Sequence, residues 1–328
     1  MFGIPANILG SAKETPRSEA SAQDIKQSLH AVIATAGKII LGKDQQLKLA
    51  VCCLLARGHV LIEDLPGVGK TTLAHVLAKC LGLHFQRIQF TSDLLPADIL
   101  GASVYNRNSS EFHFVPGPIF AQLILADEVN RTTPKTQSAL LEAMEENQVT
   151  IEGKTYSLPV PFFVIATQNP NYQIGTFPLP ESQLDRFLMR LEIGYPDNVS
   201  EKALLKGEDR RDIVQNLQPV ISPEQLMALQ KHVPSVVVSD ALIDYVQTLL
   251  NFSREAAFYR TGLSPRAGLA LVRAAQAWAL LDGRTHTLPE DVQAVLPHVA
   301  GHRLVAAPEF RDQSALELAS HLLKVAVP

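Results

Sequence analysis

The feature that most constrains this chain is a glycine-containing loop between an apolar run and a helical pattern. Residues 60–62 predict a short buried strand, Gly67 and Gly69 predict a tight turn, and a helical pattern begins at Lys70. A strand, a glycine loop and a helix N-terminus in this order direct backbone N–H groups and the positive end of the helix dipole towards one point, which favours a bound anion. The sequence therefore predicts a phosphate-binding loop.

Individual side chains of this loop have separate predicted roles. The Lys70 ammonium is placed to contact the β- and γ-phosphates of a nucleotide, and the Thr71 hydroxyl is placed to bind Mg²⁺. Asp64 stands where the usual phosphate-loop pattern has its first glycine, so the pattern is incomplete. The prediction depends on the strand–loop–helix context. The residues expected to bind nucleotide are Gly67, Val68, Gly69, Lys70, Thr71 and Thr72.

Composition excludes several classes of protein. The chain has 328 residues, enough for two domains, and its net charge of −4 comes with no basic cluster, which argues against a protein built to bind nucleic acid. No apolar run reaches the length of a membrane span. The three cysteines are Cys52, Cys53 and Cys80, which form neither a disulfide framework nor a zinc-ligand spacing. We expect a reducing, cytoplasmic location.

The chain divides into three parts by pattern. Residues 1–20 are expected to form a loose arm, residues 21–196 an α/β core, and residues 197–328 a smaller all-helical domain. Continuous apolar runs in the core predict parallel strands covered by helices on both faces. The predicted strands are 60–62, 84–90, 123–127, 162–167 and 188–193. The helices predicted in the second domain are 226–233, 240–252, 265–281, 290–296 and 314–325.

Other segments interrupt the alternation of the core. Two β-hairpins are predicted, over residues 102–115 and 149–158, because turn residues separate two short apolar-alternating runs in each. In the first hairpin, Phe112 and Phe114 share a face and are interpreted as packing residues. Further helices are expected over residues 116–120 and 181–186.

Polar side chains follow two of the predicted strands. Asp127 and Glu128 end the apolar run 123–127, and Asn169 follows the next strand of the core. Open α/β sheets bind ligands at the carboxyl ends of their strands. Asp127 is expected to hold Mg²⁺ through water, and Glu128 to polarise an attacking water. An amide at Asn169 is placed to orient that water or contact the γ-phosphate, although an isolated Asn is more often a turn residue.

Two arginines are candidates for stabilising the charge that develops on a phosphoryl group. Arg186 is the last residue of the predicted helix 181–186, and Arg266 opens a helix of the second domain. Arg131 and Arg190 are lesser candidates. A single arginine is more often a surface charge, so the sequence alone leaves both readings open.

An ordered set of segments resembles the MoxR family of AAA+ ATPases over roughly residues 25–310. These segments are 66–72, 116–120, 126–131, 135–144, 166–170 and 183–187. The resemblance implies an AAA+ core with a helical lid. It implies that residues 66–72 are Walker A, Asp127 and Glu128 Walker B, Asn169 sensor 1, Arg186 the arginine finger and Arg266 sensor 2. The two hairpins match the helix-2 and pre-sensor-1 inserts of this branch.

The resemblance also implies a function and partners. It implies an ATP- and Mg²⁺-dependent, chaperone-like ATPase that remodels or matures a client protein, as a homo-oligomer in a hexameric ring. A von Willebrand factor A-type partner protein is a further expectation, since this chain contains no such domain. In this pattern Arg186 is expected to act in trans on the neighbouring subunit's nucleotide. Arg266 is expected to reach the γ-phosphate of its own subunit from the lid.

Three alternatives are weighed against this reading. A magnesium-chelatase-type ATPase subunit has the same inserts and a metal-insertion partner. A non-hydrolysing, nucleotide-gated scaffold is the second, and the intact set Glu128, Asn169, Arg186 and Arg266 weighs against it. A nucleic-acid motor is the third, and the charge balance disfavours it.

Overall fold

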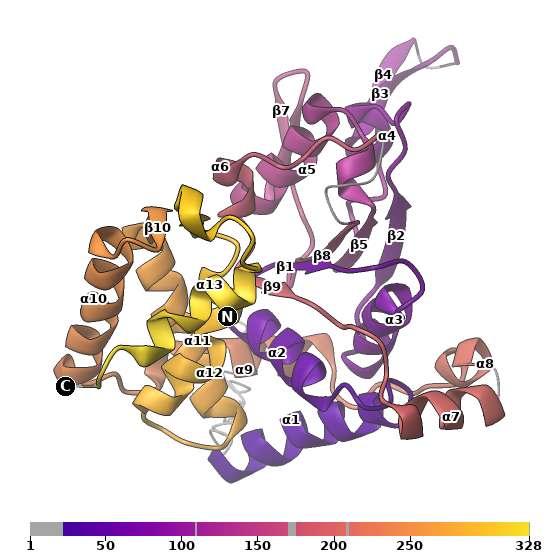
Figure 1. Ribbon diagram of the computed structural model, residues 1–328. Helices are drawn as coiled ribbons and strands as arrows, with labels where there is room; N and C mark the ends of the chain where they lie inside the picture. Colours follow the sequence, from indigo (N-terminus) through magenta and orange to yellow (C-terminus); the bar gives the residue numbers. More distant parts are fainter. Residues whose placement is uncertain (1–21, 109, 170–174, 208–209, 328) are drawn as a thin grey trace, which may run out of the picture.

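A five-stranded parallel sheet forms the centre of the core (Figure 1). The structure is a computed structural model that describes residues 22–108, 110–169, 175–207 and 210–327, so the predicted N-terminal arm lies outside the described residues. The strand order is β2-β5-β8-β1-β9, and every neighbouring pair is parallel. The strands are β1 (Val60–Glu63), β2 (Phe85–Gln89), β5 (Leu123–Asp127), β8 (Phe163–Gln168) and β9 (Met189–Leu191).

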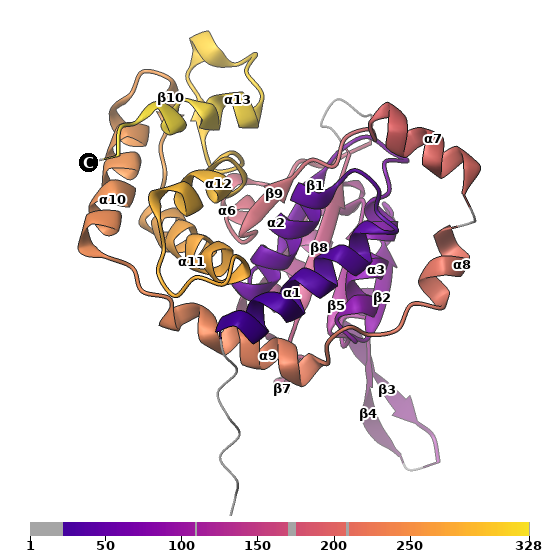
Figure 2. The same cartoon turned by 90° about the horizontal axis from the view of Figure 1, so that it is seen from below.

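The inner strands explain the apolar runs of the sequence. β5 and β8 are buried at every residue because each has a strand on both sides and helices over both faces. One face is covered by α1 (Ala22–Gly37), α2 (Asp44–Leu55) and α3 (Lys70–Cys80) (Figure 2). The other face is covered by α4 (Pro96–Leu100) and α5 (Pro134–Glu146). The predicted α/β class of the core is confirmed.

Both predicted hairpins are present. β3 (Gly101–Asn106) pairs with β4 (Glu111–Pro116), and β6 (Gln148–Ile151) pairs with β7 (Lys154–Ser157). The hairpins meet where Phe114 stacks on Tyr156, with ring centroids 4.1 Å apart. Phe112 is 66% exposed and contacts Tyr105 of the paired strand, with ring centroids 5.3 Å apart, so it packs within its own hairpin, whereas Phe114 packs between the hairpins. The first hairpin projects from the body of the molecule (Figure 1).

The helix predicted over residues 116–120 is wrong. β4 runs to Pro116, and a turn follows in which Phe120 N–H donates to the Gly117 carbonyl. Two prolines, Pro116 and Pro118, remove backbone donors from this segment. Gly117 also lies against the α4 end, where a Cβ would come 2.2 Å from the Ile99 carbonyl oxygen. The segment is therefore shaped by backbone contact with α4.

The C-terminal part is mainly helical, with one addition. β10 (Tyr259–Thr261) and β11 (Val305–Ala306) form a small antiparallel sheet, so this part is not all-helical as predicted. These two strands could not be predicted from the sequence, because each has only two or three residues, too few to show an alternating pattern, and their pairing joins distant parts of the chain. The helices are α7 (Asn198–Lys206), α8 (Arg210–Gln215), α9 (Pro223–His232), α10 (Asp240–Glu255), α11 (Pro265–Leu281), α12 (Pro289–Ala300) and α13 (Ala315–Ser320).

The lid packs on the core through α11. Lys48 of α2 lies 4.0 Å from the centroid of the Trp278 ring and forms an ion pair of 2.7 Å with Asp282. α7 and α8 lie apart from the lid helices α10 to α13, on the far side of the core (Figure 2). None of the helices that the structure describes has the length and apolar content needed to span a bilayer.

The remaining elements are short. α6 covers Glu181–Leu184, so it is two residues shorter than the predicted helix 181–186. Arg186 lies in the turn that follows it. The 3-10 helices are Val129–Arg131, Val233–Ser235, Pro308–Phe310 and Leu322–Lys324.

Candidate active site

The phosphate loop lies between β1 and α3, as the sequence predicts. Gly67 and Gly69 have φ values of 86° and 94°, a left-handed conformation that glycine adopts without strain. Lys70 is the first residue of α3, and its ammonium donates a 2.6 Å hydrogen bond to the Asp64 carbonyl. Burial lowers the pKa of Lys70, while Asp64 and Asp127 oppose that shift. The lysine is therefore held at the loop by contacts that a phosphate could replace.

Asp64 has a structural role at the position of the missing glycine. Its carboxylate accepts hydrogen bonds from the backbone N–H groups of Ile193 (2.7 Å) and Gly194 (2.6 Å), and from Leu65 N–H at 2.7 Å. These bonds tie the start of the phosphate loop to the segment that leaves β9. Backbone donors thus stabilise the charge of this acid and fix its orientation.

A cavity of about 410 Å³ opens beside the loop. Gly67, Val68, Gly69 and Thr72 contribute one wall. The other walls come from the segment after α1, from the segment after β9 and from α7, with the side chains Ile39, Ile40, Leu41, Lys43, Ile193, Tyr195, Pro196, Glu201, Leu204 and Leu205. A mostly apolar cavity next to a phosphate loop has the chemistry to hold a nucleotide base.

Asp127 ends β5 in a network of hydrogen bonds. Its Oδ1 accepts from the Thr167 hydroxyl at 2.6 Å, and its Oδ2 pairs with the Arg87 guanidinium at 2.6 Å. Oδ2 also accepts from Arg87 Nε at 3.1 Å, which occupies both of its lone pairs, whereas Oδ1 accepts one hydrogen bond and retains a lone pair. Together with the exposed Thr71 hydroxyl at the loop, Asp127 supplies the hard oxygen ligands that Mg²⁺ prefers, so these residues fit a Mg²⁺ ion that keeps part of its water shell.

Glu128 is held in an unusual backbone conformation. Its φ of 58° lies in the left-handed region, which costs about 1–3 kcal/mol for a residue with a side chain. Its carboxylate accepts from Asn169 Nδ2 (3.1 Å) and Gln89 Nε2 (3.0 Å), and it pairs with Arg131 Nε at 3.2 Å. The strained backbone turns this side chain to the sheet edge, where Asn169 meets it.

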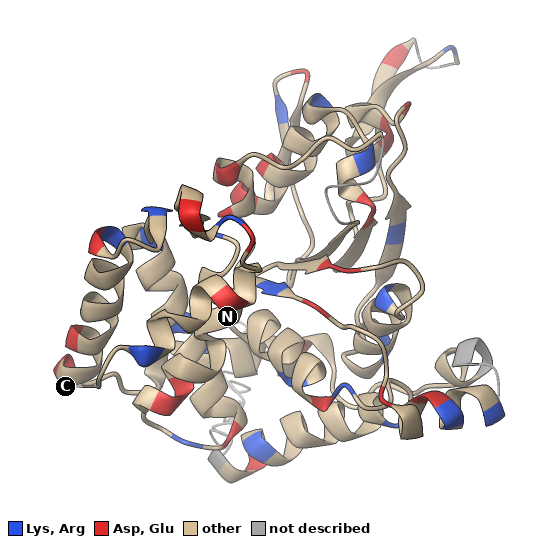
Figure 3. Cartoon of the chain, in the orientation of Figure 1, with Lys and Arg blue, Asp and Glu red and all other residues tan. Residues whose placement is uncertain are grey.

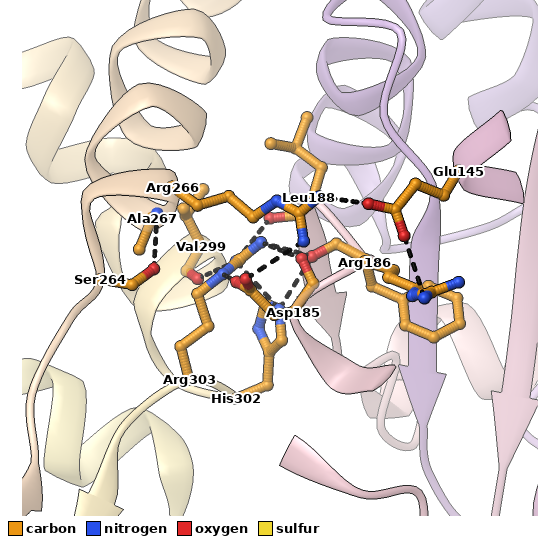
Figure 4. A network of polar contacts seen from close by, with 11 residues as sticks. Glu145, Asp185, Arg186, Leu188, Ser264, Arg266, Ala267, Val299, His302 and Arg303 are labelled. Carbon is orange, nitrogen blue, oxygen red and sulfur yellow. Dashed lines mark hydrogen bonds and ion pairs between the residues drawn. The ribbon is translucent and has the colours of Figure 1, made fainter. Parts of the chain in front are cut away.

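The predicted arginines lie in a different place. Arg186 Nη2 is 3.0 Å from one oxygen of the Glu145 carboxylate, and Arg266 Nη2 is 2.5 Å from the other (Figure 4). Arg303 pairs with Asp185 at 2.6 Å, and Asp185 in turn faces Arg266. We call these three arginines and two acids the arginine cluster. It lines a cavity of about 260 Å³ between core and lid, whose lining includes no phosphate-loop residue.

The placement of Arg266 differs from the sequence expectation. Its side chain is engaged by Glu145 and Asp185, at the end of α5 and after α6, and it shares Glu145 with Arg186. Because one carboxylate holds both guanidinium groups, the two arginines form one unit. In this structure Arg266 therefore does not reach the phosphate loop of its own chain. Arg190, a lesser candidate, pairs with Glu63 and Glu192.

Comparison with known proteins agrees with this geometry. Residues 59–189 match the ATPase family associated with various cellular activities (AAA), and residues 251–320 match the AAA lid domain. The chain is 40% identical to chaperone MoxR1 of Mycobacterium tuberculosis over 294 residues, which cover 85% of this chain and 76% of that protein. It is 32% identical to protein MoxR of Paracoccus denitrificans, covering 84% and 88% of the two chains. The chain belongs to the MoxR family of AAA+ ATPases.

Two further relatives extend the likeness. An uncharacterised Bacillus subtilis protein, YeaC, is 46% identical over 289 residues, 88% of this chain and 90% of its own. The crystal structure of a "putative ATPase" from Cytophaga hutchinsonii matches with a TM-score of 0.84 and 36% identity, over 94% of this chain and 97% of that one. The similarity to these two relatives thus extends over most of the chain.

Sequence reasoning missed several residues of this MoxR-family site. Arg87 and Gln89 lie two positions apart on β2, so both reach the acids at the end of the neighbouring strand β5. Thr167 also went unnoticed, although its hydroxyl links Asp127 to the Glu128 N–H (2.9 Å). The positions of Arg87 and Gln89 on either side of Ile88 were a usable signal that they share one face of the strand. Arg303 had none, because its partner Asp185 is 118 residues away.

Proposed function

We propose that this chain hydrolyses ATP in the presence of Mg²⁺ and uses the turnover to remodel a client protein. The contact between Asn169 and Glu128 carries the proposal, because it places a carboxylate and an amide together at the sheet edge next to the phosphate loop. Residues 67–72 would hold the phosphates, and Thr71 and Asp127 the ion. Bound Mg²⁺ would neutralise phosphate charge and orient the phosphoryl group. Glu128 would polarise the attacking water.

The arginine cluster supports a subunit-to-subunit mechanism. Its cavity is lined by five arginines but only two acids, an excess of positive charge that suits a polyanion. The positions of Arg186 and Arg266 away from the phosphate loop favour a role towards the nucleotide of a neighbouring copy. We therefore assign both arginines to action in trans, within a homo-oligomer for which the family pattern implies a hexameric ring.

The client role rests on resemblance. The name of the relative MoxR1, a chaperone, supports a protein client, and the family pattern supports a von Willebrand factor A-type partner and a cytoplasmic location. Positive and negative residues are interspersed along the chain (Figure 3), and this balance gives no support to nucleic acid as the client.

Mixed assemblies test the trans mechanism. Lys70→Ala subunits keep both arginines but should bind ATP only weakly, and Arg186→Ala subunits should bind ATP without the finger. Mixing the two should restore hydrolysis, since a finger in trans is worth about 10³–10⁵ in rate. A mixture of Arg186→Ala with a Lys70→Ala Arg266→Ala donor should recover less.

Co-assembly of differently tagged subunits is the control for this experiment. No recovery in co-assembled mixtures, together with a specific activity of the parent protein that does not rise with concentration, would rule out the trans mechanism. Absence of ATP hydrolysis by the parent protein at any concentration, with tight ATP binding intact, would instead favour a nucleotide-gated scaffold.

A further inference from the structure

Arg303 follows the end of α12 in the lid and donates hydrogen bonds to one short segment of the core. Only 6% of its side chain is exposed. Its Nε donates to Asp185 Oδ1 at 2.6 Å, and its Nη2 donates to the carbonyls of Asp185 (3.1 Å) and Phe187 (2.8 Å). Its Nη1 donates to the Leu188 carbonyl at 3.2 Å. A guanidinium suits this task because its donors are fixed in one plane.

The carbonyl groups that Arg303 binds bracket Arg186. Asp185 precedes the finger residue in the chain, and Phe187 and Leu188 follow it. The neighbouring lid residue His302 adds a ring-nitrogen contact of 2.9 Å to the Phe187 carbonyl. The backbone on both sides of Arg186 is thus held by the lid (Figure 4).

The same anchor extends to Arg266. Asp185 uses one carboxylate oxygen for Arg303, while its other oxygen lies 3.7 Å from Arg266 Nη1. Arg266 and Arg186 share the Glu145 carboxylate. A shift of Arg303 would therefore disturb the acid that faces Arg266 as well as the backbone of Arg186.

We propose that Arg303 is a positioning residue, which holds segment 185–188 so that Arg186 and Arg266 are presented together to the nucleotide of the neighbouring subunit. The proposal rests on the trans mechanism given under Proposed function. It makes the orientation of the lid a determinant of arginine placement, because the anchor is on the lid and the finger is on the core. The defect caused by losing Arg303 should belong to the subunit that donates the arginines.

The expected effect of Arg303→Gln is on the rate of ATP hydrolysis, and only when the substitution is in the subunit that donates the arginines. A displacement of about 1 Å in a positioned group can lower a rate about 100-fold. Arg303→Gln in the donor subunit should therefore reduce the recovered hydrolysis by about 10- to 100-fold. Its affinity for ATP should stay unchanged in a chain with an intact Lys70, because the phosphate loop shares no lining residue with the cavity of the arginine cluster.

Three mixtures separate these effects. The reference mixture combines the Lys70→Ala donor with the Arg186→Ala acceptor. The second places Arg303→Gln in the donor, and recovery should be lost. The third places Arg303→Gln in the acceptor, and recovery should equal that of the reference, since the acceptor contributes no finger to the measured reaction.

A matched lid arginine provides the control. Arg284 binds the buried carboxylate of Asp291 at 2.5 Å, with no contact to the arginine cluster in the part of the chain that the structure describes. Arg284→Gln in the donor should leave recovery at the reference level. Thermal unfolding establishes that each variant is folded. If Arg303→Gln does not fold, Asp185→Asn, which removes the paired charge but keeps the shape of the side chain, replaces it in the second and third mixtures.

The outcomes are distinct. No recovery in the reference mixture overturns the trans mechanism, and the role of Arg303 with it. Recovery in the reference mixture that persists with Arg303→Gln in the donor overturns only the positioning role. An equal loss with the substitution in the donor or in the acceptor indicates general damage to the fold, and it also overturns the positioning role. Loss confined to the donor supports it.

Discussion

The proposed nucleotide site and the arginine cluster are built in different ways. The nucleotide site assembles where parallel strands end, so the fold of the sheet alone brings Lys70, Asp127, Glu128 and Asn169 to one edge. The arginine cluster joins the core to the lid: Arg266 meets Glu145 across 121 residues, and Arg303 meets Asp185 across 118. The hydrogen bonds of the first region are made within the core, whereas those of the second depend on where the lid docks.

The two regions also differ in charge. In the nucleotide site, acids are held by amides, a hydroxyl and single arginines. In the arginine cluster, Glu145 holds two guanidinium groups, and these contacts lower the pKa of Glu145 and raise that of Arg266. The first arrangement suits a cation and a reacting water, and the second suits an anion brought from outside the chain.

Glu128→Gln should give the largest effect among the changes confined to the nucleotide site. The amide keeps the shape of the side chain and removes its basicity, so the hydrolysis rate should fall by about 10²–10⁴ while ATP stays bound. Single-turnover kinetics with calorimetry for ATP binding measure both. In mixtures with Arg186→Ala subunits, the Glu128→Gln protein should still donate its arginines. Hydrolysis at the parent rate would contradict the role of Glu128.

Lys70→Ala should weaken ATP binding. Loss of a hydrogen bond to a charged group costs about 1.5–3 kcal/mol, which corresponds to about a 10- to 100-fold rise in the Kd. Calorimetric titration with ATP measures the change. Arg186→Ala is the matched control, because it removes a cation from the arginine cluster and should leave the affinity unchanged. Equal losses in both variants would break the separation of the two regions.

Acid should lower the free energy of unfolding through His302, which lies beside Arg303 of the arginine cluster. Burial first, and then the neighbouring Arg303, hold the pKa of His302 well below its ordinary value. Below about pH 6.5, His302 therefore binds a proton in the unfolded chain but stays neutral in the folded chain. As the pH falls further, this difference lowers the free energy of unfolding by about 1.4 kcal/mol per pH unit.

The free energy of unfolding at pH 7.5 and pH 5.5 measures this loss. His302→Gln should be less sensitive to acid than the parent, because glutamine does not titrate. The buried His59, whose pKa burial lowers to about 4, remains in both proteins and contributes equally to both. Identical pH dependence in the two proteins would contradict the prediction.

Local patterns predicted most of the core. The phosphate loop, the two acids after β5 and both hairpins depend on residues close together in the chain, and their periods and turn residues are visible in the sequence. The errors arose where distant contacts compete with local preference. Residues 116–120 looked helical, but contact with the end of α4 and two prolines decided their shape.

The side chains of the proposed nucleotide site could be assigned from the sequence alone, because strand, glycine loop and helix follow one another directly and parallel strands end at a common edge. The orientation and partners of the arginines are set by contacts between distant parts of the chain. A guanidinium on a lid helix could pair with many of the carboxylates in the chain, and the docking of the lid determines which of them lie within reach. The docking of the lid brings Arg266 next to Arg186, and it brings Arg303 to the backbone on either side of Arg186. Packing of the apolar faces of α2 and α11 sets the distance between lid and core.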